Sequence, residues 1–201
     1  MDATIWVVIL SIAAGVVPTI FYALLLWLAD RHEKEPLMLL AVTFVWGAVP
    51  AIVLAIILEE IFGVPLYIWS LQGAELISSS VVAPLVEESV KALAVAVLYL
   101  LFRHEFDGIL DGIIYGALVG LGFAMTENVA YFLRSFSSGS WEQWTTTVLI
   151  RSLFFGLTHA LYTGIIGASF GAARLTRSRR QRYGMLLAGW TIAVALHGFH
   201  N

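Results

Sequence analysis

The chain has 201 residues, of which 60% are hydrophobic and 12% charged, with a mean hydropathy of +0.87. These values exclude an ordinary soluble domain, and the absence of cysteine excludes disulfides and thiolate metal ligands. The formal net charge of −3 says little, because the distribution of charge between loops is what matters in a membrane protein. Apolar stretches of about 20 residues fit helices that cross a bilayer core about 30 Å thick, so we predict an integral membrane protein.

Six apolar segments follow one another and predict an all-α fold, a polytopic transmembrane bundle with at least six spanning helices. They cover about residues 5–29, 37–58, 75–102, 108–133, 144–173 and 183–201. A spanning β-barrel would need segments of about 10 residues with alternating polarity, a pattern that this sequence lacks. We expect residues 1–201 to form a single domain. The last segment is still apolar at Asn201, which is compatible with a chain truncated after that residue and with further helices beyond it.

Basic residues gather in alternate loops. The first, third and fifth loops hold eight of them, whereas the amino terminus and the second and fourth loops hold Arg134 alone. Cytoplasmic loops retain Lys and Arg, so the amino terminus is predicted to be extracytoplasmic. The basic fifth loop, residues 174–183 (RLTRSRRQRY), is expected to contact anionic lipid. Nothing else in the sequence supports a nucleic-acid partner, so none is expected.

The third segment places two carboxylates and a lysine among apolar residues. A charge at the bilayer centre costs about 2.5–3.5 kcal/mol on insertion scales, so such groups are expected to face a protein interior. On a helix, Lys91 lies within reach of both Glu87 and Glu88. One lysine neutralises one carboxylate, which leaves the other as a candidate general base, and Glu88 is the favoured one. A buried ion pair that only joins helices is the alternative interpretation.

The later segments add further polar groups at compatible depths. These candidates are Glu127 and Asn128 in the fourth segment, His159 in the fifth, and His197 and Asn201 on one face of the sixth. His200 lies about 60° from that face and is a weaker candidate. Arg151 is interpreted as a counter-ion or anchor without a catalytic part. At a rise of about 1.5 Å per residue, the candidates overlap in the outer half to the middle of the bilayer and can form one polar cluster.

Two chemistries stay open for such a cluster. In the first, a carboxylate takes a proton from water while positioned donors hold the oxyanion of peptide hydrolysis. In the second, a divalent metal ion such as zinc activates the water. Its ligands would be Glu88, Glu127, His159 and His197, and they would come from several helices because no HExxH helix is present. An ion- or proton-coupled transporter and a non-catalytic scaffold are the competing classes.

Four motifs follow one another along the chain: EESVK (87–91) as EExxK, FAMTEN (123–128) as FxxxEN, a histidine in the following helix, and HGFHN (197–201) as HxxxN. In this order they resemble the PrsW family of membrane proteases, which is distantly similar to the CAAX-prenyl and bacteriocin-processing intramembrane proteases. The resemblance covers the whole chain, including the DRHEKEP loop after the first segment. Four motifs in order are far more specific than any one of them.

The resemblance implies an endopeptidase in a prokaryotic cell membrane. It would cut a single-pass membrane protein on its extracytoplasmic side, as in site-one cleavage of an anti-sigma factor. In the related proteases the paired glutamates activate water, while histidine and asparagine support the oxyanion. By resemblance these roles fall on Glu87 or Glu88, His159, His197 and Asn201. Glu127 completes the catalytic set, with Lys91, Phe123 and Asn128 in support, and the distant relatives carry an arginine one residue after the position of the lysine.

Overall fold

The computed structural model describes residues 3–30, 34–68, 72–137 and 140–201, and within these ranges the chain is helical between short loops and contains no strand. This confirms the all-α prediction. The elements, in which η marks a π-helical stretch, are α1 (Ala3–Ala29), α2 (Leu37–Trp46), η1 (Gly47–Ala51), α3 (Ile52–Ile68), α4 (Ala74–Ile77), η2 (Ser78–Val82), α5 (Ala83–Leu101), α6 (Ile109–Ser137), α7 (Trp141–Leu149), η3 (Ile150–Phe154), α8 (Thr158–Leu175) and α9 (Arg179–His200).

Four stretches of the described chain are long and apolar enough to cross a bilayer. They are Thr4–Ala29, Leu37–Ile68, Ile109–Ser137 and Trp141–Leu175. The prediction of at least six spanning helices was therefore an overstatement. The reason is charge and polarity: α5 carries two glutamates and a lysine within its 19 residues, and α9 joins an arginine-rich first turn to two histidines in its last turn.

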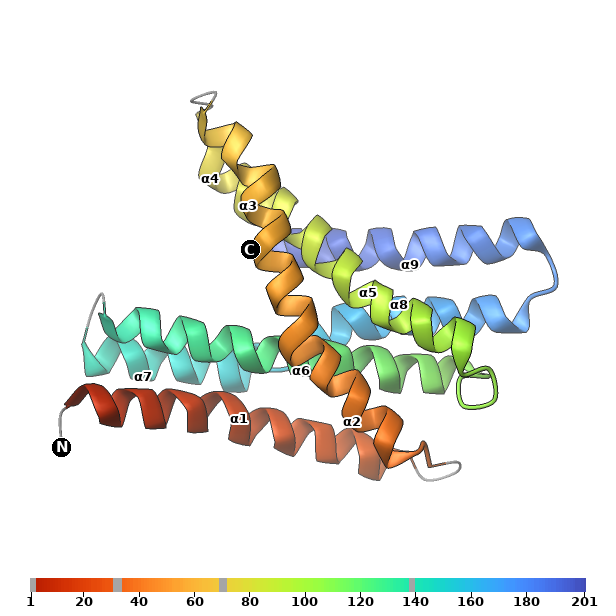
Figure 1. Ribbon diagram of the computed structural model, residues 1–201, viewed down its shortest axis with the longest axis horizontal. Coiled ribbons are helices and arrows are strands. Elements are labelled where there is room, and N and C mark those ends of the chain that lie inside the picture. The colour runs from red at the N-terminus through yellow and green to blue at the C-terminus, as the bar shows by residue number, and fades with distance from the viewer. Residues whose placement is uncertain (1–2, 31–33, 69–71, 138–139) are drawn as a thin grey trace.

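Helix α6 is the central helix of the bundle. Figure 1 shows α1, α6 and α9 running nearly parallel, while α2, η1 and α3 form one inclined rod that crosses them. Three of the largest fully buried side chains, Tyr115, Phe123 and Phe132, come from α6. The main core cluster joins residues of α6 to residues of α2, α5 and α8. Elements far apart in the sequence therefore meet around this one helix.

Glycines let α6 contact its neighbours backbone to backbone. A Cβ atom on Gly120 would lie 2.2 Å from the carbonyl oxygen of His159 in α8, and one on Gly122 would lie 2.0 Å from that of Phe44 in α2. Real Cβ atoms do not approach an oxygen so closely, so these crossings require residues without a side chain. The contact at Gly120 fixes the position of His159 along α6. Glu127 lies two helical turns after Gly120 on the same helix.

A buried polar group lies near the N-terminal end of α6. Glu35, in the loop between α1 and α2, donates its backbone N–H to an oxygen of Asp30 at 3.3 Å and accepts a hydrogen bond from the hydroxyl of Tyr115. Burial raises the pKa of the Glu35 carboxyl from 4.5 to about 7, and the nearby carboxylates of Asp111, Asp30 and Glu105 add to the rise, against the opposing effect of the tyrosine hydrogen bond. The carboxyl thus stays neutral up to a higher pH in the folded protein than in the unfolded chain.

We expect the stability of the protein to fall as the pH rises from about 4.5 to about 7. A carboxyl whose pKa is higher in the folded than in the unfolded state stabilises the fold fully below the unfolded value, and this contribution is lost as the pH rises through the folded value of about 7. Thermal unfolding in detergent between pH 4.5 and 8 measures it. Glu35→Gln, which stays neutral, should flatten the profile, and an unchanged profile in this variant would assign the pH dependence to other groups.

Candidate active site

Helix α5 supplies the centre of the site. Glu87, Glu88 and Lys91 are 6%, 0% and 0% exposed. The lysine Nζ donates to Glu87 Oε2 and to Glu88 Oε1, both at 2.9 Å. These contacts follow from the spacing of three and four residues on a helix, which places both carboxylates next to the ammonium. One ammonium thus holds two buried carboxylates.

The two predicted histidines reach this ion pair from α8 and α9. His159 Nδ1 lies 3.1 Å from the Lys91 Nζ, and His197 Nδ1 lies 2.9 Å from Glu88 Oε1. The second oxygen of Glu88 accepts a hydrogen bond from the Thr163 hydroxyl at 3.2 Å. Both oxygens of Glu88 are therefore engaged, and three helices converge on this one carboxylate.

A second group of polar side chains adjoins the first through His159. Its Nε2 lies 2.9 Å from Glu127 Oε2, and the same oxygen accepts a hydrogen bond from Arg151 Nη2 at 2.7 Å. Arg151 also donates from Nε to Asn128 Oδ1 at 2.7 Å and stacks over the ring of Tyr131 at 3.8 Å. Glu127 is consequently held by two donors and is not part of the ion pair on α5.

The protonation of both imidazoles follows from their partners. An ammonium only donates and a carboxylate only accepts, so a neutral His159 carries its lone pair on Nδ1, toward Lys91, and its proton on Nε2, toward Glu127. A neutral His197 carries its proton on Nδ1, toward Glu88, and its lone pair on Nε2, which lies 3.9 Å from Glu87 Oε2. His159 therefore connects the two polar groups, with one ring nitrogen facing each.

Two polar cavities open onto these residues. The smaller, of about 200 Å³, is lined by Glu127, Asn128, Arg151, His159, His200 and Asn201 among others. The larger, of about 450 Å³, is lined by Glu87 and Glu127 together with residues of α3, α4 and η2. Asn201 lines both cavities, and its amide donates to the backbone oxygen of Ser79 at 3.0 Å. This residue thus lies at the rim of the site.

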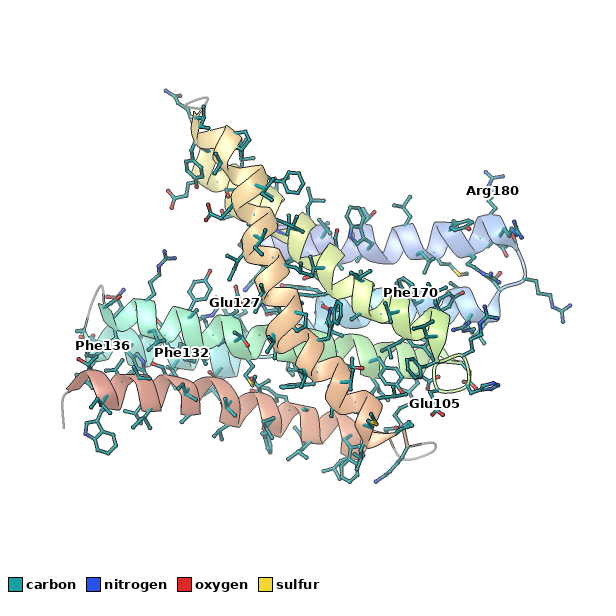
Figure 2. All side chains as sticks on the ribbon, in the orientation of Figure 1. Glu105, Glu127, Phe132, Phe136, Phe170 and Arg180 are labelled. Carbon is teal, nitrogen blue, oxygen red and sulfur yellow. The ribbon has the colours of Figure 1, made fainter. Side chains whose placement is uncertain are left out.

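A third cavity, of about 550 Å³, lies between α3 and α6. It runs from Ile52, Val53 and Ile56 to Glu87 and Glu127, and Figure 2 shows Glu127 close to the place where the rod of α2, η1 and α3 crosses α6. Ile56 is 57% exposed on the outer surface of α3. A mostly apolar groove therefore leads from the side of the bundle to the buried carboxylates.

The structure brings most of the predicted site residues together. Glu87, Glu88, Lys91, His159 and His197 are in direct contact as described, and Phe123 lies beneath the ammonium at 3.8 Å. Glu127 and Asn128 belong to the second group, and Asn201 to the rim.

Sequence reasoning missed two contributors to the site, Thr163 and Glu59. Thr163 lies four residues after His159, and this helical spacing could have identified it. Arg151, interpreted from the sequence as a counter-ion or anchor, pairs with Glu127 and also donates to Asn128. Glu59 lines two of the cavities and was overlooked because the second segment was ended at residue 58, whereas α3 continues to Ile68.

Four of these side chains could hold a metal ion. Glu87, Glu88, His159 and His197 each offer one ligand atom, and these atoms all lie within 4.8 Å of one another. Carboxylate oxygen and imidazole nitrogen are donors that zinc accepts. The predicted ligand set differs from this group in one member, because it has Glu127 in place of Glu87.

Buried carboxylates and imidazoles lie beside these cavities, inside a helical bundle with stretches long and apolar enough to cross a membrane. These features define a membrane protein with a hydrolase-like polar centre. Residues 35–201 match the model of the PrsW family, described as intramembrane metalloproteases, and the chain belongs to this family. It is therefore an intramembrane protease whose substrate is a membrane protein.

Curated relatives agree with this assignment. The chain is 33% identical to the "Protease PrsW" of Geobacillus kaustophilus over 196 residues, which cover 94% of the chain and 77% of the relative. It is 28% identical to that of Bacillus subtilis, covering 94% and 80%, and 30% identical to that of Clostridioides difficile, covering 84% and 68%. No solved structure matches the chain.

Proposed function

We propose that this protein is an endopeptidase that cuts a single-pass membrane protein, such as an anti-sigma factor, near the extracytoplasmic side of a prokaryotic cell membrane. The observation that carries the proposal is the buried contact of two glutamates with a lysine and two histidines, next to cavities that reach the surface. Peptide hydrolysis requires a base, positioned donors and water in one place, and this arrangement combines carboxylates and donors with cavities that have room for water.

Glu87 is the general base in this proposal. Glu88 is fully buried and uses both oxygens in hydrogen bonds, whereas Glu87 lines both the polar cavity of about 450 Å³ and the groove between α3 and α6. Water can therefore reach Glu87 but not Glu88. This differs from the preference for Glu88 drawn from the sequence. Glu87 would take a proton from water as the water oxygen adds to the scissile carbonyl carbon, and return it to the leaving amine.

The oxyanion would be held by donors around the smaller polar cavity. Arg151 and Asn201 present N–H groups there, next to His159, and preorganised donors in a water-poor site stabilise developing negative charge strongly. Glu127 and Asn128 would keep the guanidinium in place. His197 would fix the orientation of Glu88 and through it the position of Lys91.

A divalent metal ion such as zinc would be held by Glu87, Glu88, His159 and His197. Its chemistry would be Lewis-acid polarisation of the scissile carbonyl. The ammonium of Lys91 already contacts three of these four residues, so the proton transfers and binding contacts proposed above are assigned to the side chains alone.

Access to the site supports cleavage near the outer surface. The alternation of basic loops predicts an extracytoplasmic amino terminus, and Figure 2 shows Arg180 and Glu105 toward the end of the bundle opposite Phe136. The larger polar cavity is lined by Tyr67 and Glu75 at the α3–α4 connection, which this orientation places outside. The membrane segment of the substrate would approach through the groove between α3 and α6, because that groove joins the lipid-facing surface to Glu87.

Reconstitution in liposomes with a single-pass anti-sigma factor labelled at both ends tests the proposal. We expect one cut near the extracytoplasmic end of the membrane segment, identified by the mass of the two products. An intact substrate together with ion flux driven by a pH gradient would instead support a transporter. Cleavage on the cytoplasmic side would overturn the proposed orientation while leaving the protease assignment untouched.

A further inference from the structure

We propose that the ammonium of Lys91 is the resident cation of the group formed by Glu87, Glu88, His159 and His197, and that it excludes a divalent metal ion from this group. The donors have the types and spacing that zinc accepts. The space among them, however, already holds a positive charge supplied by the chain itself. The inference concerns metal binding and does not depend on the proposed substrate or cleavage side.

The distances place the ammonium among the candidate ligands. The Nζ atom lies 2.9 Å from Glu87 Oε2, 2.9 Å from Glu88 Oε1 and 3.1 Å from His159 Nδ1. It therefore contacts three of the four ligand residues, whose donor atoms all lie within 4.8 Å of one another. A zinc ion would lie about 2.0–2.2 Å from a ligand atom of each residue, so ion and ammonium would share one small space.

The hydrogen bonds of the ammonium use the electron pairs that a metal would need. The lone pair of His159 Nδ1 faces Nζ, because a lysine can only donate and the other ring nitrogen faces Glu127. One oxygen each of Glu87 and Glu88 accepts from the same nitrogen. A divalent ion would have to displace all three bonds at once.

The surroundings favour a cation at the position of the ammonium. Lys91 is 0% exposed and its Nζ lies 3.8 Å above the face of the Phe123 ring, a contact that favours a cation. In a buried site the repulsion between an ammonium and a divalent ion a few ångströms apart is strong. The two cations are thus alternative occupants, and this chain supplies the lysine.

The ammonium of Lys91 therefore supplies the positive charge that a bound metal ion would otherwise supply to these carboxylates. It neutralises Glu88 and holds Glu87 next to the cavity, so the site is complete without a metal ion. The group would bind a metal ion only when the ammonium is removed.

Metal binding by the purified full-length chain in detergent tests this directly. Wild type and Lys91→Met, which keeps an unbranched side chain but removes the terminal ammonium, are dialysed against Zn²⁺ and their metal content is measured. We expect a tight zinc site in Lys91→Met that is at least about tenfold weaker in wild type, and that His197→Ala added to Lys91→Met removes again. Arg151→Met, which deletes a positive charge next to the group but not within it, is the matched control and should gain no site.

A cobalt titration of the wild-type protein keeps the inference falsifiable even where Lys91→Met does not fold. We expect no visible absorption of four-coordinate Co²⁺ in wild type. Tight zinc binding in wild type, equal to that of Lys91→Met, or a four-coordinate cobalt spectrum that His197→Ala abolishes, would overturn the proposal.

Discussion

Replacing Glu87 by glutamine is expected to lower the rate of substrate cleavage by about 10²–10⁴-fold, the usual contribution of a general base, with little loss of stability. An amide cannot take a proton from water, but it keeps the shape of the side chain and an oxygen that accepts from Lys91. Single-turnover cleavage of a reconstituted substrate measures the rate, and thermal unfolding in detergent measures the stability.

Glu88→Gln is expected to act chiefly on the fold. Its carboxylate is fully buried and bonded to Lys91, His197 and Thr163. Lys91 keeps Glu87 as a partner in this variant, but glutamine at position 88 weakens hydrogen bonds in a fully buried place. A hydrogen bond to a charged group contributes about 1.5–3 kcal/mol, so this variant should unfold at a clearly lower temperature than Glu87→Gln.

The exposed Glu142 on α7 provides a matched control for both substitutions. Glu142→Gln should change neither cleavage nor stability. A stable, inactive Glu88→Gln beside an active Glu87→Gln would reverse the assignment of the base and refute the argument from water access.

Glu127→Gln is expected to lower both stability and cleavage, because one oxygen of this carboxylate accepts from Arg151 and from His159. A hydrogen bond to a charged group contributes about 1.5–3 kcal/mol. The side chains of Arg151 and Glu127 are 23% and 19% exposed, so solvent screening should place the loss toward the lower end of that range. Cleavage should fall because the imidazole and the guanidinium lose the carboxylate that positions them beside the cavity.

A double-mutant cycle of Glu127→Gln and Arg151→Gln measures the coupling between these two side chains separately from their other contacts. We expect a coupling of about 0.5–3 kcal/mol between the two positions in the free energy of unfolding, measured by SDS titration. Additive losses would mean that the ion pair does not hold Glu127, and that its effect on cleavage has another origin.

Local spacing explains what could be predicted of the site. Glu87, Glu88 and Lys91 lie on consecutive turns of one helix, so their contact needs no knowledge of any other element. The same regularity identified the polar positions of the later helices as members of one cluster. The prediction from hydropathy that α5 and α9 span the membrane was an overstatement. Their charged residues and histidines make both helices less apolar than a membrane span.

The contacts between helices could not be predicted from local spacing. His159 lies 68 residues from Lys91, and His197 lies 109 residues from Glu88. Whether such groups touch depends on how closely α6 and α8 approach at Gly120 and on the tilt of α3 across the bundle. The rotation of each helix about its axis also decides which carboxylate faces a cavity. The sequence does not determine this rotation, so it could not distinguish Glu87 from Glu88.

The sequence by itself determined the membrane environment, the helical class, the family resemblance and the inventory of polar groups, because hydropathy and helical spacing are local properties of the chain. Only the tertiary structure decided that Glu87 lines two cavities while Glu88 is fully buried, that Arg151 holds Glu127, and that Lys91 lies among the candidate metal ligands. These features arise where backbones from distant parts of the chain pack within contact distance, and no periodicity within a single helix encodes that packing.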